Sequence, residues 1–195
     1  MELQKENQRI TWRKIRGHWK TINEHKMLVL QHCFRIGLYW QGLTHDLSKY
    51  LPSELLMGFR YYEDGKSSPN NGERREKGYS YAWMHHKGRN RHHFEYWTDY
   101  ALHPVSDRCP LQPVQMPRRY VAEMLMDRIS ASKNYNKETY TQHHPLLYFE
   151  KGKSHYLLHP QTEKELRGML RILDERGEEE LIRFVRDYYL KGYEI

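Results

Sequence analysis

Histidine and aspartate residues that could bind a metal ion recur along this chain. Of its 195 residues, 13 are histidine, a side chain that fills a core poorly and binds metals well. Imidazole and carboxylate ligands together suit Mn, Fe, Zn, Ni or Co. One helix cannot surround an ion, so such a site needs ligands from several helices. The candidates, in chain order, are His25, His45, Asp46, His85, His86, His92, His93 and Asp127.

Each candidate taken alone also has a simpler explanation. A single helical histidine is more often an edge-of-core residue than a ligand, and adjacent histidines can simply lie on the surface. His25 and His32 are seven residues apart and share a helix face, so either could be the first ligand. The adjacent His45 and Asp46 could both bind only if the backbone directs them to one ion or to two neighbouring ions. Which histidines between 85 and 93 bind is left open.

The elements that must position these residues are helical almost throughout, which predicts an all-α, single-domain fold. Apolar residues spaced by threes and fours predict a long first helix over 11–41, capped by Thr11 and ended by Gly42. No segment alternates long enough to predict a strand. Further helices are expected over 52–63, over 79–101 (one helix or two short ones), over 118–134, from Pro160 with a capping box of Thr162 and Glu165, and over 177–191.

The stretches between these helices divide the chain. Residues 64–78 are rich in turn residues and predict an exposed loop, and 103–117 carry four prolines and predict an ordered loop. We expect one helical domain over 1–195, with a metal-binding core at 20–135 and a C-terminal helical extension at 136–195.

Composition excludes several classes of protein. The net charge is +7, but the first 20 residues carry six Lys and Arg against two Glu, so a nucleic-acid partner is possible without being favoured. Two cysteines make neither a disulfide framework nor a thiolate zinc site, which favours a reducing, cytoplasmic location. No apolar run reaches the length of about 18 residues that a membrane span needs.

The order of the candidate ligands resembles the HD-domain superfamily of metal-dependent phosphohydrolases over about residues 20–130. His25 in HKMLVLQHCFRIG matches the first-helix histidine, His45-Asp46 the signature doublet and Asp127 the distal aspartate. HDLSKYLP is similar to a subgroup that has a lysine three residues after the doublet, additional histidines and two metals, although its histidine spacing differs. The joint pattern HDLSKY and HHxxxNxHHxEYW resembles more closely an uncharacterised bacterial and phage family of HD-like proteins.

The resemblance implies a helical bundle around one or two divalent transition-metal ions, and hydrolysis of a nucleotide or related phosphoester by a metal-activated water. In that reading Asp46 holds the ion and Lys49 lies near the substrate phosphate. Arg89, Asn90 and Arg91 could contact phosphate or could equally form a polar loop tip. Aromatic residues around 79–100 could stack on bases, but we favour a place in the core.

Two other functions fit the same residues. An HD-like protein with two irons would activate dioxygen and act as an oxidase or oxygenase. A non-catalytic, basic helical module would bind nucleic acid and use the metal only as structural support. We expect a small phosphorylated substrate, which could be a nucleotide, and no membrane partner.

Overall fold

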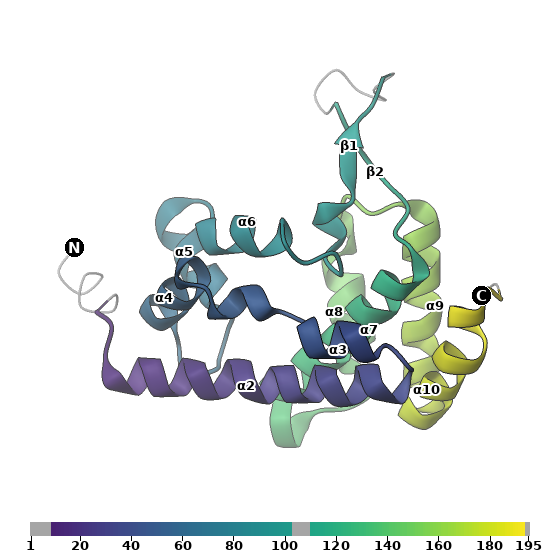
Figure 1. Cartoon of the computed structure of the whole chain (residues 1–195), viewed down its shortest axis with the longest axis horizontal. Coiled ribbons are helices and arrows are strands. Elements are labelled where there is room, and N and C mark those ends of the chain that lie inside the picture. Colours follow the sequence, from purple (N-terminus) through teal and green to yellow (C-terminus); the bar gives the residue numbers. More distant parts are fainter. Residues whose placement is uncertain (1–8, 103–109, 194–195) are drawn as a thin grey trace.

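The computed structural model describes residues 9–102 and 110–193 and confirms an all-α fold (Figure 1). In these residues the sheet is limited to one hairpin of two short strands. None of the helices in the two described ranges combines the length and the apolar character that crossing a bilayer requires. Residues 103–109 of the predicted proline-rich loop, which include Cys109, lie outside the described residues.

Helix α2 (Trp12–Arg35) forms one long side of the molecule (Figure 1). Thr11 caps it as predicted, because its hydroxyl accepts a hydrogen bond of 3.3 Å from the Lys14 amide. The predicted end at Gly42 is wrong. Gly37, at φ 82°, adopts the left-handed conformation that ends the helix, and a separate helix, α3 (Tyr39–Thr44), follows.

A short 3-10 helix η1 (Leu47–Tyr50) and helix α4 (Pro52–Tyr61) come next. The predicted exposed loop at 64–78 is largely wrong, because residues Pro69–Lys77 form helix α5. Pro69 begins this helix, and Glu73 anchors it by accepting hydrogen bonds from the Ser80 hydroxyl and the Ala82 amide. A tertiary contact therefore overrides a local composition that is typical of turns.

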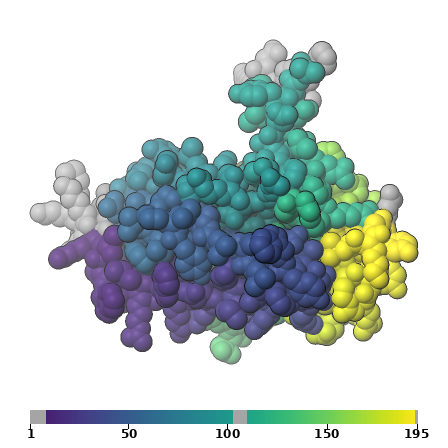
Figure 2. Space-filling view, viewed as in Figure 1, coloured from purple at the N-terminus to yellow at the C-terminus, as the bar shows by residue number. Residues whose placement is uncertain are grey.

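Helix α6 (Tyr81–Lys87) and the 3-10 helix η2 (Phe94–Tyr96) lead to the hairpin. Strand β1 (Thr98–Tyr100) pairs antiparallel with β2 (Leu111–Pro113), and the hairpin projects from the body of the molecule (Figure 2). The preference for a core position of the aromatic residues at 79–100 is wrong for most of them. The exposed ones are Tyr79, Tyr81, Tyr96 and Tyr100.

The second half of the chain supplies the central helix and the layer behind it. Helix α9 (Pro160–Arg176) is capped by His159, not by Thr162, whose buried hydroxyl instead accepts a hydrogen bond from the Met116 amide. The elements are α7 (Arg118–Asn136), η3 (Lys137–Thr139), α8 (His144–Gly152), η4 (Lys153–His155), α9 (Pro160–Arg176), α10 (Glu178–Asp187) and η5 (Tyr189–Lys191).

The core lies around α7, which packs between α2 and α9. Val29 of α2, Leu125 and Ile129 of α7, and Leu166 and Leu170 of α9 are all fully buried in one cluster. The C-terminal helices therefore share this core with the first half of the chain. Any polar side chain on α7 that faces α2 is drawn into this interior.

Candidate metal centre

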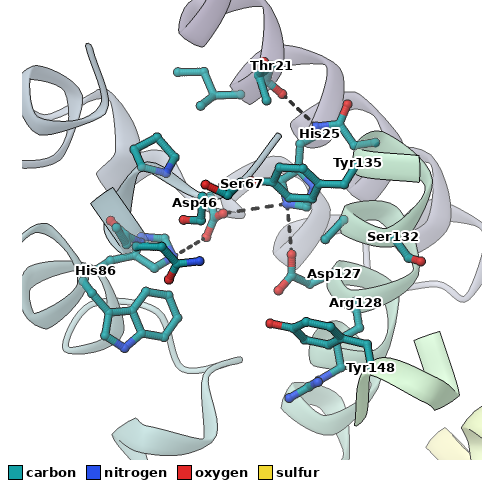
Figure 3. Close-up of a pocket in the computed structure, with 18 of the residues that line it drawn as sticks. Thr21, His25, Asp46, Ser67, His86, Asp127, Arg128, Ser132, Tyr135 and Tyr148 are labelled. Atoms are coloured by element: carbon teal, nitrogen blue, oxygen red, sulfur yellow. Dashed lines mark hydrogen bonds and ion pairs between the residues drawn. The ribbon is translucent and has the colours of Figure 1, made fainter. Parts of the chain in front are cut away.

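The His45-Asp46 doublet lies between α3 and η1, where the backbone makes a sharp change of direction. Asp46 has φ 54°, a left-handed conformation that Asp tolerates better than most residues but that still carries strain. This turn directs two adjacent side chains inward, and both are buried. The Asp46 carboxylate lies between the histidines contributed by α2 and those contributed by α6 and the loop after it (Figure 3).

One set of ligand atoms faces Asp46 Oδ2. His25 Nε2 lies 2.9 Å and His45 Nε2 3.6 Å from Asp127 Oδ1, and the same two nitrogens lie 4.0 and 3.4 Å from Asp46 Oδ2. The four residues come from α2, the doublet and α7, and their ligand atoms lie within 4.8 Å of one another. They could hold a metal ion.

A second set faces the other oxygen of the same carboxylate. His86 Nε2 and His92 Nε2 each lie 3.3 Å from Asp46 Oδ1, and His86 Nε2 lies 2.9 Å from His93 Nε2. Asp46, His86, His92 and His93 also bring their ligand atoms within 4.8 Å of one another. Asp46 therefore belongs to both sets, with one oxygen toward each.

Several of these atoms are buried without a hydrogen-bond partner among the described residues. They are His45 Nε2, Asp46 Oδ1 and His92 Nε2. A buried polar atom without a partner costs about 1–3 kcal/mol, and a ligand bound among these three atoms would offset that cost. A metal ion would do so, and these residue types fit it.

Two glutamates orient the histidine rings from behind. Glu123 Oε1 lies 3.0 Å from His45 Nδ1 and 3.1 Å from His92 Nδ1, so one carboxylate accepts from a histidine of each set. Glu54 Oε2 lies 2.8 Å from His86 Nδ1. An Nδ1 hydrogen bond to a carboxylate leaves Nε2 as the ligating nitrogen, an arrangement typical of histidines that bind metals.

The charges of the site favour ionised carboxylates. Burial raises the pKa of Asp46, but His45 and Lys49 outweigh burial and hold that pKa well below its usual value. Burial also raises the pKa of Asp127, but the neighbouring His25 and His45 outweigh burial and hold this pKa well below its usual value. The Lys49 ammonium lies 2.6 Å from Asp46 Oδ2, and this carboxylate raises the pKa of Lys49 despite burial, so the lysine stays charged.

The histidines differ from one another in their surroundings. Burial, and after it the neighbouring His92 and His86, holds the pKa of His93 well below its usual value, which favours the neutral ring that a ligand must have. For His92, burial acts in the same direction, but the neighbouring carboxylates of Asp46 and Glu123 outweigh it and raise the pKa to about 10. Metal binding by the set would therefore release protons.

Some candidates lie away from both sets. His85 bonds Glu54 Oε1 at 2.6 Å through Nδ1 and Ser53 at 3.0 Å through Nε2, so both ring nitrogens are engaged elsewhere. His32 lies about two helical turns after His25, with its Nδ1 2.7 Å from the Ser130 hydroxyl and its Nε2 3.3 Å from Glu178. Of the two alternatives on α2, the structure therefore places His25 in the centre.

The predicted phosphate contacts at 89–91 lie outside the lining of the cavity beside the ligands. Asn90 is buried and donates to the Ser48 hydroxyl and the His86 carbonyl, which is a structural role. Arg89 and Arg91 are exposed, and Arg91 lies over the Tyr96 ring at 5.7 Å. None of the three lines the cavity beside the ligands. The alternative of a polar loop tip describes the two arginines better.

A cavity of about 860 Å³ opens beside the ligand sets (Figure 3). Asp46 and Lys49 form part of its wall, whereas His45 and His92 lie behind it. His18, two turns before His25, borders it beside Gly58, where a Cβ atom would lie 2.1 Å from His18 Nε2. Burial lowers the pKa of His18 to about 4, so this ring is neutral near pH 7.

Reasoning from the sequence missed the two glutamates and the contribution of α8. Glu123 precedes Asp127 by four residues and so shares its helix face, a signal that could have identified it. Glu54 carries no comparable signal. Helix α8, in the stretch before Pro160 for which no element was predicted, brings Tyr148 and Lys151 to the cavity wall.

Comparison with known proteins places the chain in one family without assigning an activity. Residues 14–172 match the family described as "Family of unknown function (DUF5662)", and the chain belongs to it. The match spans α2 to α9 and so includes every ligand of both sets. No curated protein and no solved structure matches the chain.

Proposed function

We propose that this member of a family of unknown function is a metal-dependent phosphohydrolase of the HD-domain type. Its substrate would be a nucleotide or a related phosphoester. The observation that carries the proposal is the position of Asp46, whose two oxygens face two separate sets of histidines at the wall of a large cavity. A carboxylate shared between two sets of ligands is an arrangement that suits a centre for two ions.

The donor set supports divalent transition metals over magnesium. Besides two carboxylates, the sets contain several imidazoles. Imidazole suits Fe, Zn and Ni, whereas Mg prefers oxygen ligands. When bound, two such ions would supply Lewis acidity and would lower the pKa of water, to about 7 in favourable zinc sites. The residues that would hold them are His25, His45, Asp46 and Asp127 on one side, and Asp46, His86, His92 and His93 on the other.

Access to the ligands favours a catalytic site over a structural one. His25, Asp46 and Asp127 line the cavity, so one face of the centre meets the space that a substrate would occupy. A purely structural site is closed on all sides by protein ligands. Lys49 also lines this face, and its ammonium would offset the charge of phosphate oxygens as a point charge.

The family match does not itself link the chain to the HD-domain superfamily, so the resemblance supports the proposed function alone. It agrees with the all-α fold and with the convergence of His25, His45, Asp46 and Asp127 from separate elements. The cytoplasmic location expected from the cysteine content belongs to the same proposal.

Metal analysis of protein purified without metal-affinity resins tests the proposal, followed by a panel of phosphoesters under each metal found. Asp46→Ala should lose both ions and all turnover while its helical circular dichroism stays that of the wild type. Asp174→Ala is the matched control, because Asp174 also lies 2.8 Å from a histidine nitrogen, that of His143, but away from the centre. A wild-type protein that binds no metal on titration would refute the proposal, as would full activity of Asp46→Ala.

The nitrogen-rich donor set also keeps oxidation as a second candidate, since iron binds such sets. Two irons with consumption of dioxygen, and no hydrolysis, would support it. Salt-sensitive binding of nucleic acid that survives Asp46→Ala would instead support the non-catalytic module.

A further inference from the structure

The cavity continues from the ligand sets along α7 to a second cationic position, Arg128. Asp127 and Arg128 are neighbours on α7, and adjacent helical residues point about 100° apart. Asp127 reaches His25 of α2, whereas Arg128 lies toward α8 beside Tyr148 (Figure 3). The two side chains therefore border different parts of one cavity.

Aromatic rings hold the Arg128 guanidinium on this wall. Its Cζ atom lies 5.8 Å from the ring centroid of Phe149 and 5.5 Å from that of Tyr156. Such cation–π contacts attract the guanidinium to the rings but use none of its N–H donors in hydrogen bonds to oxygen. The donors remain available for a ligand that enters the cavity.

Arg128 lacks the partners that a half-buried arginine normally has. Its Nε is buried without a hydrogen-bond partner, and in the described ranges no carboxylate lies within 4.0 Å of its guanidinium. Arg167 is a useful contrast, because it lies over the same Phe149 ring at 5.7 Å but is paired with Glu150 at 2.9 Å and Glu163 at 2.6 Å. One arginine on this ring is neutralised by the protein and the other is not.

The surroundings of Arg128 favour an anion. Lys151 of α8 and Lys66 line the same cavity, and Tyr148 and Tyr156 add flat apolar walls. Glu95 also borders the cavity, and the charge of Arg128 acts on its carboxyl group, but within the described ranges the two make no ion pair at 4.0 Å or less. A guanidinium offers parallel N–H donors that match two oxygens of a phosphate.

We propose that Arg128 binds a second phosphate group of the substrate, distinct from the phosphate that reacts at Asp46. The inference rests on the proposed function and narrows it to substrates that carry two phosphates, such as a nucleoside bisphosphate. Arg128 then selects the substrate, and the ligand sets act on its other phosphate.

Turnover of matched substrates tests this selection. A nucleoside 5'-monophosphate is compared with the 3',5'-bisphosphate of the same nucleoside. Arg128→Met keeps an aliphatic side chain over the rings but removes the charge. It should lower kcat/KM for the bisphosphate about 10- to 100-fold, as expected for loss of a charged hydrogen bond. The monophosphate should change much less. Arg167→Met removes the same charge beside the same ring and should leave both substrates unaffected.

A binding measurement separates this inference from the proposed function. Inorganic pyrophosphate is titrated calorimetrically into the full chain in chloride buffer, in wild type, Asp46→Ala and both arginine variants. Asp46→Ala should retain binding and Arg128→Met should lose it, whatever the outcome of the turnover assays. Pyrophosphate binding that is equal in Arg128→Met and Arg167→Met would overturn the assignment of Arg128, and so would an equal loss of kcat/KM for both substrates.

Discussion

Glu123 links the two ligand sets, and its replacement by glutamine tests whether the centre holds two ions. Its Oε1 atom receives hydrogen bonds from His45 at 3.0 Å and His92 at 3.1 Å, one histidine from each set. Glutamine keeps a carbonyl oxygen that can accept from both rings, but it removes the negative charge. Charge-assisted hydrogen bonds are about twice as strong as neutral ones, so both histidines become poorer ligands.

The expected size of the effect follows from this geometry. Loss of a carboxylate behind a metal-binding histidine typically weakens metal binding 10- to 100-fold, or about 1.4 to 2.7 kcal/mol. Because Glu123 supports a histidine in each set, Glu123→Gln should weaken both binding events by this amount. Glu54 contacts His86 but no ligand of the other set, so Glu54→Gln should weaken only one.

Calorimetric titration of metal into chelator-treated protein measures both events. Glu165→Gln is the control, because Glu165 is also buried and accepts a hydrogen bond from the Tyr189 hydroxyl, but outside the centre. If Glu123→Gln binds metal as tightly as Glu165→Gln does, Glu123 does not support the ligands. If Glu123→Gln weakens only one of the two metal-binding events, Glu123 does not support both ligand sets in solution.

Two further predictions concern neighbouring histidines and pH. His86→Asn should reduce the amount of bound metal, and His85→Asn should not, because only His86 turns its Nε2 toward Asp46. Elemental analysis measures both, and equal losses would contradict the placement of His85 outside the ligand sets. Burial lowers the pKa of His18 from 6.5 to about 4, so the unfolded chain takes up a proton at this residue before the folded chain does. The stability contributed by the neutral ring is complete above pH 6.5 and is lost as the pH falls toward 4, by about 2 kcal/mol at about pH 4.5. Urea titrations at both ends of this range should show the wild type losing more stability than His18→Gln does, by the amount that His18 contributes. Parallel profiles of the two proteins would argue against it.

The helical fold was predictable because periodicity dominates the chain, but its boundaries were not. The end of α2 depends on Gly37, whose left-handed conformation is visible only in the folded backbone. The predicted loop at 64–78 failed for a different reason. Its turn-rich composition is outweighed by the buried Glu73, which holds α5 against the start of α6 through hydrogen bonds that no local pattern announces.

The residue types of the centre were easier to predict than the assignment of each histidine to one ligand set or to neither. Residue type and order on separate helices were enough to select His25, His45, Asp46 and Asp127 as a candidate set. Among the histidines of the 85–93 cluster, however, the direction of each ring decides its role. His85 and His86 are adjacent on α6, so about 100° of helix rotation sends one toward Ser53 and the other toward Asp46.

The backbone at Asp46 explains why a shared carboxylate could not be read from the doublet alone. In a regular helix, adjacent side chains diverge, so His45 and Asp46 would point to different neighbours. The left-handed conformation at Asp46 brings both inward, and such strain persists only where surrounding contacts maintain it. Those contacts are the histidines of both sets and Lys49, all of which lie within 4.0 Å of the carboxylate or of one another. The strained turn and the shared position of Asp46 are therefore two consequences of one arrangement, in which the ligand sets and the local fold depend on each other.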